Sequence, residues 1–354
     1  MKENLNLKKK NDRLLYIDAL RGLAMLMVVF VHVEIFSFFN FGHTTTLMYV
    51  LSSVHMPLFF FISGFCIYKP DRKCYITRVK KDFMRLILPA VIIGLLYTYL
   101  RKGEDLLFFF SNSMKAGYWF TISLFEILLV YYAIKHIIPN NDKAFIVVLW
   151  IVSGLLFLLK LPLKVIGGLE IVGNYLCLHQ TFNYFVFFVL GVSIAKYKVK
   201  SEVLMSNTVF STVVLLLFAL GSLSLYGILP KYVGASVVWR VLDTLGETFV
   251  GMSGVLLLYI IFNKMQSVIN SRGIFSRILL IVGNKTLPIY LIHYFLLPNL
   301  PQVGTFLIDY PSVLSELFLG LIISFMTIAA SLIVNEIVRI ASPFIGCALL
   351  GNRE

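Results

Sequence analysis

The chain has 354 residues, of which 59% are hydrophobic, 15% aromatic and only 14% charged. Soluble domains carry about a quarter charged residues. This composition therefore excludes a soluble enzyme, a disordered chain and a nucleic-acid-binding protein, and it predicts an integral membrane protein. The net charge of +13 fits that class, because membrane proteins concentrate Lys and Arg in cytoplasmic loops. The four cysteines lack CxxC or metal-ligand spacing, so we expect neither a disulfide framework nor a bound metal.

Long apolar segments follow one another along the chain, and a membrane-spanning helix needs roughly 20 such residues. The sequence therefore predicts an all-α, polytopic membrane protein of about ten transmembrane helices, near residues 14–38, 45–67, 86–100, 118–138, 143–160, 182–195, 207–228, 241–262, 278–299 and 312–338. The first segment lacks a small-residue cleavage site, so we expect a retained helix rather than a signal peptide. The expected parts are a basic cytoplasmic N-terminus (1–13), one transmembrane domain (14–338) and a cytoplasmic tail (339–354).

The distribution of Lys and Arg predicts the orientation of these helices. With the N-terminus inside, 23 of the 31 Lys and Arg fall on inner segments and 7 on outer ones, and Arg21 lies within the membrane. This asymmetry is typical of cytoplasmic loops, so both termini are predicted to be inside. The densest basic stretch, a loop over 69–85, is either a contact for lipid headgroups or a docking surface for a phosphorylated cofactor.

The first predicted helix carries four ionisable residues, Asp18, Arg21, His32 and Glu34. Placing such a side chain in the middle of a bilayer costs at least roughly 2.5 to 3.5 kcal/mol, so each of them is expected to have a structural or functional role. Arg21 and His32 are eleven residues apart, which places them on one helix face about 16 Å apart. Asp18 is the expected ion-pair partner of Arg21, whereas Glu34 falls on the opposite side, near the solvated outer interface. This face either binds a ligand or has only a structural role, with Arg21 and Asp18 as a buried ion pair and His32 as a hydrogen-bonded packing residue.

The second predicted helix contains Pro57, which should kink it, and the small residues Ser63 and Gly64, which permit close approach of a neighbouring helix. Because this helix is antiparallel to the first, Ser63 and Gly64 should lie near the depth of Arg21, and His55 near that of His32. The same small residues would also serve packing alone.

A second polar stripe occurs in the ninth predicted helix, with Tyr290 and His293 and a break at Pro288. His293 is either a hydrogen-bonded core residue or part of a site. The remaining intramembrane carboxylates are Glu126, Asp243 and Glu247, each either structural or part of a proton relay.

Several motifs in chain order together resemble the membrane-bound acyltransferase 3 family. They are YIDALRGLAMLMVVFVH, HMPLFFFISGF, the basic stretch closing in RLILP, YWFTISLFEILLVYY, YFVFFVLGVSIAKY and GNKTLPIYLIH. They extend over nearly the whole chain, and the HMPLFFFISGF form is similar to small bacterial members described as polysaccharide or fucose O-acetylases. The resemblance implies a bacterial cytoplasmic (inner) membrane protein that transfers an acetyl group from cytosolic acetyl-CoA to a surface polysaccharide or its lipid-linked precursor.

The resemblance also implies roles for individual residues. His32 matches the catalytic histidine and Arg21 its partner, with Asp18 beside it. As a neutral imidazole, His32 would act as a general base or accept the acetyl group covalently. Many relatives have two arginines three positions apart in the basic stretch, whereas here Asp82 precedes Arg85. The donor is therefore expected at Ser63, Arg78, Lys80, Lys81 and Arg85, and the acceptor at His55, Trp119, Glu126, Tyr290 and His293.

Two other functions remain open from the sequence. The polytopic architecture alone fits a glycan exporter or transporter in which the intramembrane His and carboxylates form a proton relay. An inactive scaffold within a glycan-synthesis complex is the other alternative. The ordered acyltransferase motifs argue against the exporter, and the intact pair of Arg21 and His32 argues against the scaffold.

Overall fold

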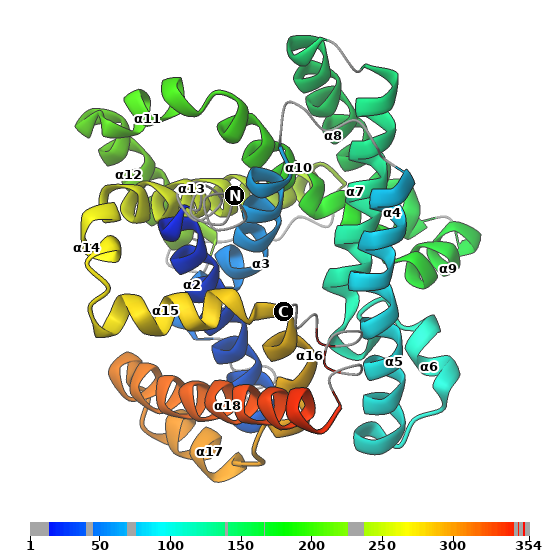
Figure 1. Ribbon diagram of the computed structural model, residues 1–354, viewed down its shortest axis with the longest axis vertical. Coiled ribbons are helices and arrows are strands. Elements are labelled where there is room, and N and C mark those ends of the chain that lie inside the picture. The colour runs from blue at the N-terminus through cyan, green and yellow to red at the C-terminus, as the bar shows by residue number, and fades with distance from the viewer. Residues whose placement is uncertain are drawn as a thin grey trace, which may run out of the picture.

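A computed structural model describes residues 14–39, 45–68, 76–138, 141–165, 167–225 and 237–342, together with Gly346 and Leu350. The predicted N-terminus 1–13, part of the 339–354 tail, and Lys69, Arg72 and Lys73 of the basic stretch lie outside these residues. Every regular element within the described ranges is a helix (Figure 1), which confirms the all-α prediction.

Nine of the described helices account for most of the predicted segments. They are α2 (Leu15–His32), α3 (Thr46–Ile67), α5 (Leu88–Tyr97), α7 (Trp119–Ile137), α8 (Asp142–Val165), α10 (Leu178–Lys196), α12 (Thr208–Leu225), α13 (Val237–Lys264) and α18 (Val313–Ala341). Other helices connect or extend them, namely α4 (Ile76–Asp82), α6 (Leu106–Ser111), α9 (Gly167–Leu176), α11 (Lys198–Ser206), α14 (Gln266–Asn270), α15 (Ile274–Asn284), α16 (Thr286–Leu296) and α17 (Pro301–Asp309).

Eight described helices are long and apolar enough to cross a membrane, and the number rises to ten if two sharply bent helix pairs each count as one span. The protein is therefore embedded in a membrane by several helices. The third span is longer than predicted and runs over Thr77–Lys102. The basic residues Arg78, Lys80, Lys81 and Arg85 consequently lie on helical turns, α4 and the π-helical turn η2 (Phe83–Ile87), and not in a loop.

The predicted ninth segment is not one helix, because α15 and α16 meet at an angle of 87°. The break falls at Lys285, whose backbone leaves the helical region (φ −117°, ψ 25°). Pro288 lacks an N–H, so a continuous helix would lose the hydrogen bond from residue 288 to the carbonyl of residue 284. In the first turn of a helix a backbone N–H has no partner within the helix, so proline is tolerated there. The chain therefore breaks at Lys285 and starts a new helix in which Pro288 lies in the first turn. The predicted kink at Pro57 is less severe, since α3 continues through that residue.

The inner helices cross at pairs of glycines. At Gly22 and Gly283 an added Cβ would overlap the backbone of α15 and α2 respectively, and at Gly64 and Gly191 that of α10 and α3. These contacts fix α15 across α2 and α10 beside α3 (Figure 1). The expectation that Gly64 allows close helix approach is thus confirmed, and Arg21 and Ser63, each next to a crossing glycine, are held on rigid elements.

Helix α2 is the central element and packs against α3, α13, α15, α16 and α18. After His32 its chain widens into a π-helical turn, η1 (Val33–Ser37), a feature that often occurs at functional sites. Glu34 lies in this turn and is 0% exposed, so the predicted solvated position was wrong. Helices α17 and α18 pack against this turn and remove it from the solvated interface.

Candidate active site

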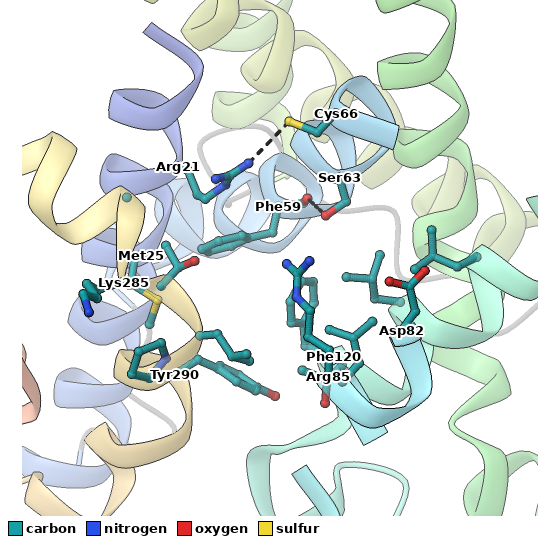
Figure 2. Close-up of a pocket in the computed structure, with 18 of the residues that line it drawn as sticks. Arg21, Met25, Phe59, Ser63, Cys66, Asp82, Arg85, Phe120, Lys285 and Tyr290 are labelled. Atoms are coloured by element: carbon teal, nitrogen blue, oxygen red, sulfur yellow. Dashed lines mark hydrogen bonds between the residues drawn. The ribbon is translucent and has the colours of Figure 1, made fainter. Parts of the chain in front are cut away.

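A cavity of about 880 Å³ lies between α2, α3, the α4–η2 segment, α7 and the junction of α15 with α16. Arg21, Met25 and Val28 of α2 line it at positions i, i+4 and i+7, and His32 continues the same row one helical turn further on. The predicted face that joins Arg21 to His32 therefore borders a real opening along most of its length. Figure 2 shows this cavity with Arg21 and Ser63 on one side and Arg85 on the other.

Cationic side chains gather around part of the cavity. Arg21, Arg78, Lys81 and Arg85 line it, and the guanidinium group of Arg85 is directed into its middle (Figure 2). Lys285 also lines the cavity, but its amino group turns away (Figure 2) and forms an ion pair of 3.6 Å with Glu336 of α18. Arginine and lysine groups in a partly desolvated site attract phosphate groups.

The expected ion pair of Arg21 and Asp18 is present, with 3.3 Å between Nη1 and Oδ1. The other terminal nitrogen of Arg21 donates to Sγ of Cys66, also at 3.3 Å, across the cavity wall from α3 (Figure 2). These two contacts hold the guanidinium plane in place while one edge of the side chain remains exposed to the cavity. Arg21 is therefore both ion-paired and accessible to a ligand.

Asp82 stands where the family resemblance implies an arginine. It lines the cavity, and its Oδ2 accepts a hydrogen bond of 2.7 Å from the hydroxyl of Tyr132 on α7. The carboxylate is thus tied to the wall while Arg85, three residues later, points inward. Lys80 is exposed and is not among the residues that line the cavity.

The rest of the wall is mainly apolar. Met56 and Phe59 of α3 and Phe120 and Leu124 of α7 line it. The small polar groups there include Ser63, whose hydroxyl donates to the carbonyl of Phe59 at 2.8 Å, and Thr121. Tyr290 and Pro288 line the end toward α16. A cationic region followed by an apolar passage suits a long ligand with a phosphorylated end.

His32 lies beyond this end and is held through both ring nitrogens. Its Nδ1 is 2.8 Å from Nε2 of His293, and its Nε2 is 3.0 Å from the hydroxyl of Tyr294. The Nδ1 of His293 is in turn 2.9 Å from the carbonyl oxygen of Ile289. The two imidazole rings are parallel within 8°. The structure therefore brings together two predicted site residues, His32 and His293, that lie 261 positions apart in the sequence.

These contacts determine where the protons lie on the two neutral imidazoles. A carbonyl oxygen only accepts, so Nδ1 of His293 must carry the proton, and its Nε2 must accept. His32 then donates from Nδ1 and keeps a lone pair on Nε2, to which the Tyr294 hydroxyl donates. The basic nitrogen of His32 is thus Nε2. Sequence reasoning did not identify Tyr294, although it directly follows His293 in the stripe.

The segment before α7 completes the site. The carbonyl oxygen of Gly117 accepts from Tyr290 at 2.9 Å and lies 3.5 Å from the Tyr294 hydroxyl. Lys115, Ala116 and Gly117 all have positive φ angles. Lys115 is 1% exposed and donates from Nζ to the carbonyls of Phe110, Asn112 and Asn174. The buried ammonium group therefore fixes a strained turn whose carbonyl points at α16, which the sequence did not reveal.

Three other predicted acceptor residues lie outside the cavity lining. His55 bonds through Nδ1 to the carbonyl of Leu51 in its own helix. Trp119 stacks against Phe60 and Tyr184, and Glu126 accepts a hydrogen bond of 2.5 Å from Thr181 of α10. The carboxylates Asp243 and Glu247 are exposed on α13. In the described part of the chain, no group of three or more His, Cys, Asp or Glu could hold a metal ion.

Fold and site together define a polytopic helical membrane protein with a cationic cavity and, one helical turn beyond its lining on α2, a hydrogen-bonded pair of histidines. The sequence matches the model of the acyltransferase 3 family, described as an acyltransferase domain, over residues 14–336, and the chain belongs to this family. It is therefore a membrane acyltransferase. No curated protein and no solved structure gives a significant match to the chain.

Proposed function

We propose that the protein is an O-acetyltransferase that moves an acetyl group from cytosolic acetyl-CoA to a hydroxyl of a surface polysaccharide or its lipid-linked precursor. The observation that carries this proposal is the orientation of His32. Its basic Nε2 is set by a hydrogen-bond chain through His293 to a backbone carbonyl, and it lies one helical turn beyond a cavity with cationic walls.

The donor site is the cavity. Arg78, Lys81 and Arg85 would contact the phosphate groups of CoA, with Arg21 deeper along α2. The apolar passage past Phe59 and Leu124 suits the uncharged arm of the donor. This arrangement lets the thioester approach His32 while the charged end stays near the cytosolic side predicted by the distribution of Lys and Arg. Asp82, held by Tyr132, leaves Arg85 as the central phosphate contact.

In the proposed reaction, Nε2 of His32 acts as the general base through its lone pair. The acceptor hydroxyl gives its proton to Nε2 while its oxygen forms a bond to the thioester carbonyl carbon. The C–S bond then breaks, and the imidazolium returns the proton to the CoA thiolate. Nδ1–H of His32 keeps its bond to His293 throughout, so the positive charge that develops is shared by a charge-assisted hydrogen bond. A positioned base of this kind contributes roughly 10² to 10⁴ in rate.

The test measures the O-acetyl content of isolated surface glycan by proton NMR, in cells that lack the gene and are complemented with wild type or variants. We expect acetyl signals to vanish in the deletion strain and in His32→Ala, and to return with wild type. His136→Ala, on the exposed end of α7, is the matched control and should restore them. Normal acetylation in His32→Ala would contradict the proposal.

The same experiment separates this function from the exporter. Loss of an exporter would leave complete glycan inside the cell, whereas loss of an acetyltransferase leaves exported but unmodified glycan. Membership of the acyltransferase family favours the second outcome.

A further inference from the structure

The hydroxyl of Tyr294 occupies the position next to the basic nitrogen of His32. It lies 3.0 Å from Nε2, and the ring centroid of Tyr294 is 4.7 Å from that of His32 and 4.2 Å from that of His293. The tyrosine is only 3% exposed. Nε2 of a neutral imidazole has one lone pair and accepts one strong hydrogen bond. A substrate hydroxyl and the Tyr294 hydroxyl therefore cannot both use it.

A second acceptor for Tyr294 is already in place. The carbonyl oxygen of Gly117 is 3.5 Å from the same hydroxyl, so a small rotation of the phenol would transfer its hydrogen bond from His32 to Gly117. This carbonyl is fixed from both sides. Lys115 ties the turn to the carbonyl of Asn174 before α10, and Tyr290 bonds to the Gly117 oxygen from α16.

Gly117 itself is required for this arrangement. Its φ of 105° is one that residues with a side chain rarely adopt. A Cβ at this position would also overlap the ring and hydroxyl of Tyr294. The turn is thus shaped so that the Tyr294 ring can lie against it.

We propose that Tyr294 is a positioning residue that covers the basic nitrogen of His32 in the absence of an acceptor. It yields that nitrogen to the acceptor hydroxyl by moving its hydrogen bond to the carbonyl of Gly117. This inference rests on the proposed acetyl transfer, and it would protect the donor from hydrolysis. The covered base is not available to a water molecule, whereas a bound acceptor hydroxyl displaces the phenol.

The test compares Tyr294→Phe with wild type in purified membranes, by two measurements. The first is the rate at which diethyl pyrocarbonate modifies His32, followed by peptide mass spectrometry. This reagent attacks an unprotonated ring nitrogen, and Nδ1 is engaged with His293, so the rate reports access to Nε2. The second is release of free CoA from acetyl-CoA without any acceptor. The matched control is Tyr97→Phe, which removes a hydroxyl from a ring 5.5 Å from that of Tyr294.

We expect Tyr294→Phe to raise both rates by about threefold to tenfold, the effect of one ordinary hydrogen bond, and Tyr97→Phe to leave both near wild type. Unchanged modification of His32 in Tyr294→Phe would overturn the inference, as would an equal increase in both variants. The proposed function is tested separately by His32→Ala. If glycan acetylation persists in that variant while Tyr294→Phe still exposes His32, the acetyl-transfer mechanism fails and the covering role stands.

Discussion

The two ring nitrogens of His32 have different partners, and this difference decides which nitrogen can act as a base. His293 fixes the proton on Nδ1, and the carbonyl of Ile289 fixes the proton on His293. Without His293, either tautomer of His32 becomes accessible, and only one of them has its lone pair toward Tyr294. His293 would therefore influence the rate through its bond to His32.

We expect His293→Ala to lower the rate of transfer by about ten- to a hundredfold, less than the roughly 10² to 10⁴ expected for loss of the base itself, with little change in the KM for acetyl-CoA. His293→Gln keeps an acceptor oxygen within reach of Nδ1 and should recover part of the rate. The measurement is acetyl transfer from radiolabelled acetyl-CoA to membrane glycan. A collapse of donor binding in His293→Ala would assign this residue to the donor site instead.

Two described cysteines, Cys66 and Cys177, are expected to differ in reactivity. This difference allows a test of whether the donor binds in the cavity. Cys66 is exposed, lines the cavity and contacts Arg21, so N-ethylmaleimide should alkylate it and CoA should protect it. Cys177 is fully buried, and burial raises the pKa of its thiol to about 12. At pH 8 it therefore remains a protonated thiol and should not react. Peptide mass spectrometry distinguishes the two. Equal alkylation of Cys66 with and without CoA would place the donor elsewhere.

Residue patterns in the sequence reveal local partners but not distant ones. The spacing of Asp18 and Arg21 predicts their ion pair, since residues three apart share a helix face, and the pair is present. The contact of His32 with His293 joins residues 261 positions apart, and no helical period reports it. The sequence does not predict the strained turn at Lys115 for a similar reason. The ammonium group that holds this turn bonds to three backbone carbonyls, and one of them, at Asn174, is distant in the sequence.

At the scale of elements, the junction of α15 and α16 allows one segment to serve two purposes. Helix α15 crosses α2 at Gly22 and Gly283, next to Arg21, while α16 carries His293 and Tyr294 to the end of the same helix. A straight helix could not contact α2 near both ends of the stripe from these positions. Hydropathy recognises only one apolar segment, and the 87° bend depends on Pro288 and on packing between segments distant in sequence.

The close crossing of α2 and α15 makes Gly22 sensitive to any side chain. We expect Gly22→Ala to destabilise the protein by about 1 to 3 kcal/mol, the usual cost of overpacking, and to weaken donor binding because Arg21 moves with the helix. Gly154→Ala is the control, since an added Cβ on α8 meets nothing within 4 Å and should preserve stability. Thermal unfolding in detergent checks both. An unchanged melting temperature in Gly22→Ala would show that α2 and α15 can move apart without loss of stability, and would contradict this prediction.

At the scale of the whole molecule, composition and the distribution of charge account for the class of fold. They predict a helical membrane protein and most of its spans, because the low charge content and the length of each apolar run follow directly from the bilayer. They do not predict which helices meet at the glycine crossings, or the cavity, because both arise only when the helices pack.

The predicted orientation is open to direct measurement. Alkaline phosphatase fused after Gly103 should be active, because the third span ends at Lys102 on the predicted outer side. The same reporter fused after Ile138, between α7 and α8, should be inactive. The reverse pattern would place the cationic cavity on the outer side and exclude cytosolic CoA as the donor.

Along α2 the cavity lining ends at Val28, one helical turn short of His32, and this bears on the proton gradient that an energised membrane must maintain. Two hydrogen-bonded imidazoles in a continuous column of water would conduct protons through the bilayer. Instead, the rings of Tyr118, Tyr290 and Tyr294 pack together beside the histidines. If the site transfers acyl groups as proposed, these aromatic rings would separate the paired histidines from the cavity, so that the reaction would not open a path for protons across the membrane.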